Sequence, residues 1–178
     1  MKLFSKWAEK EYSFLQILLA MLCAGILFLF LIPYLLIKIV PRLDATLGLP
    51  GFSPEIPGTI IGVLLMAGGF FFAWWSIYTQ IALAQGTPLP IMPTQKLLVV
   101  GPFKFCRNPM TLGTILAYSG LGVLVGSISS IGVVLLFGSL LLMYIKFIEE
   151  KELADRFGQE YLDYKAATPF IIPRIIKR

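Results

Sequence analysis

The chain has no histidine, and its 178 residues include only two cysteines, Cys23 and Cys106. There is neither a CxxC pair nor a histidine-rich spacing, so the sequence offers no ligand set for a zinc or haem site. Cys23 lies in the middle of an apolar run, and we expect Cys106 at a different depth, so the two are not predicted to pair. We therefore expect neither a structural disulfide nor a metal cofactor.

Charge is also scarce. Only 14% of the residues are charged, 57% are hydrophobic, and the mean hydropathy is +0.83. Soluble domains are typically about 45–50% apolar and about 25% charged. Both departures indicate that lipid is the solvent of this chain. Its length suits one domain, so we predict a single integral-membrane domain over residues 1–178.

Two long apolar runs, residues 12–40 and 56–83, occupy the N-terminal half. Each exceeds the roughly 20 residues that a spanning helix needs. The first run is too long for the apolar part of a cleavable signal peptide, and no small-x-small cleavage pattern follows it. Pro33 lies inside it and predicts a kink near that point. Residues 1–84 are thus predicted to form two spans.

The third apolar region, residues 110–147, is too long for one span. Its middle reads "VGSISSIG", and such small, turn-prone residues predict a hairpin of two helices, about 110–126 and 130–148. Glycines at four-residue spacing, Gly58 with Gly62 among them, permit close approach of helices in lipid. We predict an all-α membrane protein with about four transmembrane helices, the last two forming this hairpin.

The basic residues predict the orientation. Of the fifteen, only Lys38 and Arg42 lie at the C-terminal end of the first apolar run. The others precede that run, follow the second, or end and follow the second helix of the hairpin. Positive residues collect on the cytoplasmic side of short loops, so both termini are predicted to be cytoplasmic. The net charge of +5 then reflects contact with membrane lipids and requires no nucleic-acid partner. The location that fits is a prokaryotic inner membrane.

One polar stretch, "GPFKFCRNPM" at residues 101–110, lies between the apolar runs. Pro109 suits the first turn of a helix and Asn108 its N-cap. The hairpin returns near residue 147, so its two ends bring this stretch beside "FIEEKE", residues 147–152. Charges at membrane depth are paired or functional. Glu149 and Glu150 therefore form either a headgroup-level salt bridge, with Arg107 or Lys104, or part of a site.

The C-terminal segment predicts an amphipathic helix. Leu153, Phe157, Tyr161 and Tyr164 recur at three- and four-residue spacing, and polar residues take the other face. A proline-broken tail follows. The segment is either a helix under the membrane surface with a tail covering the site, or a simple surface anchor.

Two separated segments, "LVVGPFKFCRNPMTLG" and "EEKELADRFGQEYLDYKAATPFIIPR", resemble the isoprenylcysteine carboxyl methyltransferase and phospholipid methyltransferase superfamily. The members are integral-membrane enzymes that use S-adenosylmethionine. The resemblance covers roughly residues 85–174 and implies that residues 85–178 are a cofactor-binding catalytic core. It implies a methyltransferase acting on a lipophilic acceptor.

The resemblance also implies roles for particular residues. The cofactor site would consist of Val99, Val100, Gly101, Pro102, Phe103, Asn108, Pro109, Gly113, Glu149 and Glu150. Contacts to the acceptor would come from Arg107, Tyr161, Tyr164 and Lys165. Arg107 and Glu150 would be the catalytic pair, Arg107 facing a carboxylate and the acidic residues a cationic amino group.

Two positions depart from the superfamily pattern: Thr111 replaces a tyrosine, and Ala167 stands where an arginine usually lies. The second departure weakens the case for a prenylcysteine-like carboxylate as acceptor and leaves a phospholipid amine or a small thiol as plausible. The alternative function is a non-catalytic membrane accessory protein that keeps the fold. A transporter is disfavoured because the polar residues gather at one membrane face rather than near the midplane.

Overall fold

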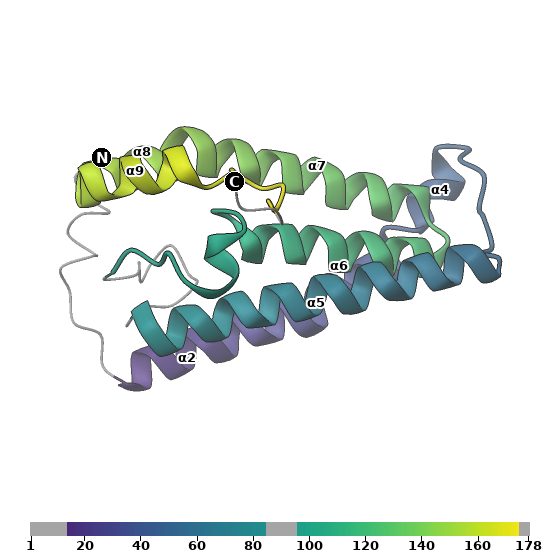
Figure 1. Cartoon of the computed structure of the whole chain (residues 1–178). Coiled ribbons are helices and arrows are strands. Elements are labelled where there is room, and N and C mark those ends of the chain that lie inside the picture. Colours follow the sequence, from purple (N-terminus) through teal and green to yellow (C-terminus); the bar gives the residue numbers. More distant parts are fainter. Residues whose placement is uncertain (1–13, 85–95, 175–178) are drawn as a thin grey trace. The chain divides into compact units, whose positions relative to one another are not determined.

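The structure is a computed structural model that describes residues 14–84 and 96–174 (Figure 1), and every regular element among them is a helix. The described residues form two compact units. The first contains residues 14–21, 72–84, 96–112 and 142–174, and the second contains residues 22–71 and 113–141. The prediction of an all-α fold is confirmed.

The first predicted span is a helix with two wide turns. Its parts are α2 (Phe14–Ile26), η1 (Leu27–Leu31), α3 (Ile32–Tyr34) and η2 (Leu35–Ile39), and α4 (Arg42–Thr46) follows. Pro33 lies in α3, between the π-helical segments η1 and η2, so the helix departs from regular α-helical hydrogen bonding on both sides of the proline, and the kink itself stays a prediction. The Tyr118 hydroxyl donates a hydrogen bond to the Phe28 carbonyl within η1, at 2.5 Å.

Helices α5 (Ile56–Ala84) and α6 (Pro109–Val125) touch through their backbones in the second unit (Figure 1). A Cβ atom added at Gly69 would lie 2.4 Å from the Ala117 nitrogen and 2.5 Å from the Gly113 oxygen. One added at Gly120 would lie 2.6 Å from the Gly62 oxygen. The predicted close packing therefore occurs, but at seven-residue spacing along both helices.

Helix α7 (Ile128–Tyr144) follows α6 after a tight turn, so the predicted hairpin is confirmed. Gly126, at φ 71°, makes this turn in a conformation that favours glycine. The buried Asp44 carboxylate caps the start of α7. It accepts hydrogen bonds from the Ser127 hydroxyl at 2.6 Å and the Ser129 N–H at 2.8 Å. The carboxylate satisfies donors that a helix start leaves free and ties α4 to the turn.

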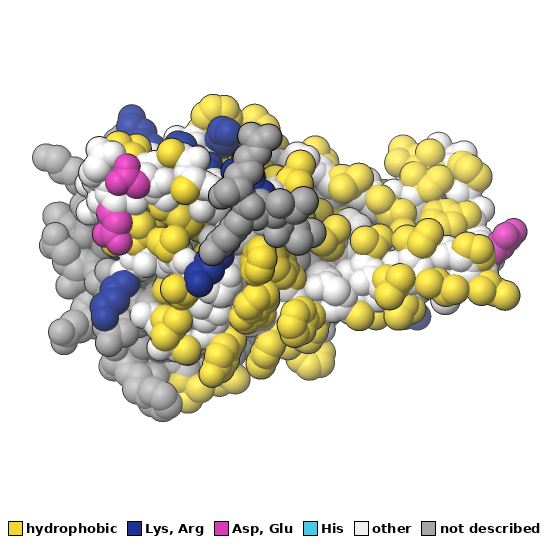
Figure 2. Space-filling view, viewed as in Figure 1, with side chains coloured by type: hydrophobic (Ala, Val, Ile, Leu, Met, Phe, Trp, Pro, Cys, Tyr) yellow, Lys and Arg dark blue, Asp and Glu magenta, His cyan; other side chains and the backbone are white. Residues whose placement is uncertain are grey.

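Three helical stretches are long and apolar enough to cross a membrane: Leu18–Thr46, Ile56–Leu83 and Ile128–Phe157. The remaining predicted span, about residues 110–126, corresponds to α6. It has 17 residues, and at about 1.5 Å per residue it falls slightly short of a hydrocarbon core of about 30 Å. Hydrophobic side chains cover much of the face seen in Figure 2. The chain is an integral membrane protein.

In the first unit, α7 continues through η4 (Ile145–Glu149) into α8 (Glu150–Phe157), and α9 (Gln159–Ala167) follows. The predicted amphipathic segment is thus helical in two pieces. Gly158 separates them at φ 56°, where other residues are strained. The turn lets α9 pack against α8 and buries Tyr161 and Tyr164.

Candidate functional site

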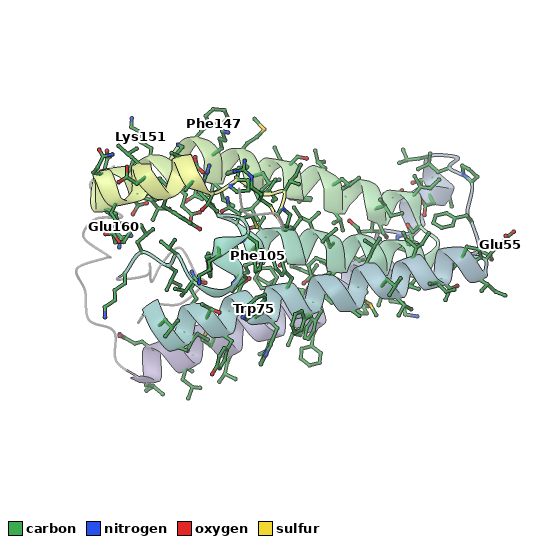
Figure 3. All side chains as sticks on the ribbon, in the orientation of Figure 1. Glu55, Trp75, Phe105, Phe147, Lys151 and Glu160 are labelled. Carbon is green, nitrogen blue, oxygen red and sulfur yellow. The ribbon has the colours of Figure 1, made fainter. Side chains whose placement is uncertain are left out.

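The polar stretch of residues 101–110 is a folded, largely buried segment. It begins with η3 (Gly101–Lys104), and Gly101 adopts φ 58° against α5, where an added Cβ would lie 3.1 Å from the Thr79 hydroxyl oxygen. The rings of Trp75 and Phe105 lie 6.2 Å apart and fix the same contact (Figure 3). Cys106 is 0% exposed, and this burial raises the pKa of its thiol to about 11.

Arg107 meets Glu150, as the hairpin predicts. Its Nε and Nη2 atoms donate to the Glu150 Oε1 atom at 2.9 and 2.6 Å, with the two side chains 8% and 2% exposed. The Lys165 Nζ atom lies 2.9 Å from the other Glu150 oxygen. Glu150 is therefore a buried carboxylate between two cations, and an ion pair of this kind is strongly destabilised when one partner is removed.

Arg107 also holds the end of the chain. Its Nη1 atom donates to the carbonyls of Lys165 at 2.9 Å and Thr168 at 2.5 Å. Together with the two bonds to Glu150, these use four of the five guanidinium N–H donors. Contacts within the chain thus use nearly all of its donors. The role in acceptor binding that the sequence assigns to Arg107 stays a prediction.

Residues 168–174 form a C-terminal strap along the polar stretch. The Asn108 amide donates to the Phe170 carbonyl at 2.9 Å, and the Arg174 N–H donates to the Phe105 carbonyl at 3.0 Å. The Phe170 ring lies 5.6 Å from the Arg107 guanidinium carbon and 5.0 Å from the Lys146 Nζ atom, within cation–π range. The strap therefore seals the predicted site segment on one side.

A cavity lies on the first unit between this segment and the helices that follow α7. It is lined by Gln80, Leu97, Leu98, Phe103, Arg107, Asn108, Ile145, Glu149, Glu150, Leu153, Phe157, Tyr161 and Tyr164. About 90 Å³ of it admits the centre of a water molecule. One water needs roughly 10–15 Å³ by this measure, so the cavity has room for about six to nine non-hydrogen atoms.

The two glutamates of the cavity differ. Glu150 is fully paired, whereas Glu149 is exposed and has no ion pair or hydrogen bond to its carboxylate within the part of the chain that the structure describes. Helix η4 places these neighbours on different sides of the same turn. Glu149 is therefore the carboxylate that is free to bind a ligand.

The two tyrosines close the wall of the cavity. The Tyr164 hydroxyl donates to the Phe103 carbonyl at 2.7 Å and so joins α9 to η3. Burial raises the pKa of both Tyr161 and Tyr164 well above its usual range, so both hydroxyls stay protonated at neutral pH. The wall is therefore uncharged on this side.

The cavity brings together seven of the residues predicted from sequence: Phe103, Arg107, Asn108, Glu149, Glu150, Tyr161 and Tyr164. Lys165 touches Glu150. The other predicted cofactor residues do not line the cavity. Val99 and Val100 are each 39% exposed, Gly101, Pro102 and Pro109 shape the segment, and Gly113 lies at the contact of α5 with α6.

Six further lining residues are not among the individually predicted site residues: Gln80, Leu97, Leu98, Ile145, Leu153 and Phe157. Five are apolar, and the residue type alone does not separate them from lipid-facing residues. Gln80 is different, because a polar side chain near the end of an apolar span is itself an indication of function.

The long apolar helices define an all-helical integral membrane protein, with a cavity lined by both polar and apolar side chains. The chain matches the phospholipid methyltransferase family over residues 58–160, and it belongs to this family. The match runs from α5 into α9 and includes the polar stretch and both glutamates. The resemblance found in the sequence is thereby confirmed. No curated protein and no solved structure matches the chain.

Proposed function

We propose that this chain transfers a methyl group from S-adenosylmethionine to a lipophilic acceptor at the membrane surface. The observation that carries the proposal is the cavity, which joins the two sequence segments that carry the resemblance and contains the free carboxylate of Glu149. We place the cavity at the cytoplasmic face, because the basic residues near it follow the positive-inside pattern.

The lining residues fit parts of S-adenosylmethionine chemically. Glu149 suits the cationic amino group, and the apolar side chains of Leu97, Leu98 and Phe103 suit a flat ring. The cavity has room for only one such part, so binding of the whole molecule requires the site to widen or the rest to lie outside it. When bound, this donor supplies a methyl group already activated on a sulfonium sulfur.

The chain itself contributes binding, alignment and exclusion of water. Glu149 binds the ammonium group, and the Arg107–Glu150 pair fixes the strap and the start of α8 around it. Tyr161 and Tyr164 exclude water from the wall behind. A phospholipid amine as acceptor needs a base to remove its proton, whereas a carboxylate or a thiolate does not.

The test uses purified protein in detergent and calorimetric titration with S-adenosylhomocysteine, the demethylated product. We expect binding by the wild type and at least about tenfold weaker binding by Glu149→Gln, since a charge-assisted contact is lost. Glu160→Gln is the matched control, because Glu160 lies exposed on α9 (Figure 3) and does not line the cavity.

Absence of binding to the wild type at millimolar ligand would refute the proposal and favour a non-catalytic accessory protein. Mass spectrometry then identifies the acceptor class, after incubation of the protein with labelled S-adenosylmethionine and a lipid extract. Methylated amines, carboxyl esters and thioethers are distinguished by mass and fragmentation.

A further inference from the structure

Gln80 presents a buried polar group that lacks a partner. It lies one residue after Thr79, which contacts Gly101, and it lines the cavity from α5. Its carboxamide oxygen is buried and accepts no hydrogen bond from any described residue. Such an atom has lost its water without gaining a donor, and this is unfavourable unless a ligand supplies the donor.

Some polar groups around the cavity are hydrogen-bonded within the chain and others are not. Arg107 donates four hydrogen bonds, to Glu150 and to carbonyls, and the Tyr164 hydroxyl donates to the Phe103 carbonyl. Glu149 and Gln80 keep free acceptors among the described residues. They differ in charge and lie on different elements, η4 and α5, so they suit two different donor groups of one ligand.

A neutral carboxamide in an apolar setting matches a neutral ring with an amino group. Glutamine pairs with the N6 and N7 edge of adenine, accepting a hydrogen bond from the amino group and donating one to the ring nitrogen. Leu97, Leu98 and Phe103 supply apolar walls in the same cavity. The space for about six to nine non-hydrogen atoms is slightly smaller than the ten of adenine, so the base also requires the widening that the whole molecule requires.

We propose that Gln80 recognises the adenine ring of the methyl donor and so selects an adenosyl ligand over other nucleosides. This inference rests on the proposed function and adds a specificity-determining residue to it. Glu149 holds the ammonium end of the same ligand, and α5 contributes the contact that reads the base.

The experiment compares two ligands, S-adenosylhomocysteine and S-inosylhomocysteine, in which a 6-oxo group replaces the 6-amino group. The wild type should bind the adenosyl compound at least about fivefold more tightly, since a good amide–adenine pair discriminates by about 1–3 kcal/mol. Gln80→Leu should lose this preference, chiefly through weaker binding of the adenosyl compound. Glu149→Gln is the control: it should weaken both ligands equally and keep the preference.

The thermal midpoint of the ligand-free protein gives an independent readout. Because Gln80 makes no bond through its oxygen, Gln80→Leu should leave the midpoint unchanged or raise it, and Gln80→Met should do the same. A lower midpoint in both variants would show a structural role and overturn the inference. Wild type that binds both ligands equally, or variants that keep the preference, would overturn it as well. If the wild type binds neither ligand, it is the proposed function that fails.

Discussion

Removing the Glu150 carboxylate is the perturbation that tests the architecture of the site most directly. Glu150→Met leaves the Arg107 guanidinium, 8% exposed, with backbone carbonyls as its only remaining acceptors among the described residues. Breaking a buried ion pair from one side costs about 3–5 kcal/mol. For a chain of this size, that predicts a fall in the thermal midpoint of about 6–20 °C. The loss of the ion pair should destabilise Arg107→Met less than Glu150→Met, because the Lys165 Nζ atom still lies 2.9 Å from the Glu150 carboxylate and neutralises it.

The double variant Arg107→Met with Glu150→Met tests whether the costs of the single variants come from the broken ion pair. Two methionines can pack where the pair lay, so its cost should be smaller than the sum of the single costs by at least about 1 kcal/mol. Thermal unfolding in detergent, followed by tryptophan fluorescence, measures all three variants, and Trp75 reports on this unit through its contact with Phe105. Additive costs, or a change under about 1 kcal/mol for Glu150→Met, would refute the reasoning.

Three further predictions concern other parts of the chain. Asp44→Ala leaves two donors of the α6–α7 turn unpaired and should cost about 1–3 kcal/mol in thermal unfolding, whereas Thr46→Val, an exposed control, should be nearly neutral. Gly69→Ala should lower the thermal midpoint, because the added Cβ would lie 2.4 Å from a backbone nitrogen. Gly68→Ala is the control, because its Cβ would meet no atom within 4 Å, and equal thermal midpoints for the two variants would contradict this prediction. Iodoacetamide at pH 8 should label Cys106 at least about 100-fold more slowly in folded than in unfolded protein, as its thiolate forms only near pH 11; mass spectrometry of peptides measures this.

Hydropathy was sufficient to predict the helices and the hairpin, because in lipid every backbone group has to be satisfied within a helix. The packing between helices was less predictable. Gly58 and Gly62 have the expected spacing, yet only Gly62 lies at the contact with α6, where Gly69 is its companion. Four-residue spacing marks one face of a helix over a single turn, and the sequence does not show which face meets a neighbour.

The meeting of Arg107 with Glu150 was predictable from the arithmetic of the hairpin, since two antiparallel helices bring their ends together. The number of hydrogen bonds that Arg107 donates within the chain was not predictable, because its partners include the carbonyls of Lys165 and Thr168. Carbonyl groups are the same in every residue, so a sequence carries no mark of them. Gln80 was not predicted as a site residue, because that prediction depended on charged residues and the glutamine amide is neutral.

The burial of Arg107 changes what the membrane encounters. In the predicted orientation, Arg107 and Lys165 count among the positive charges of the cytoplasmic side before the chain folds. After folding, both are paired with one carboxylate, and Arg107 is nearly inaccessible. Glu150 thus offsets only one of these two positive charges, and the folded cluster of Arg107, Lys165 and Glu150 carries a net charge of +1. Attraction to anionic headgroups then depends on the exposed cations, such as Lys104, Lys146 and Lys151.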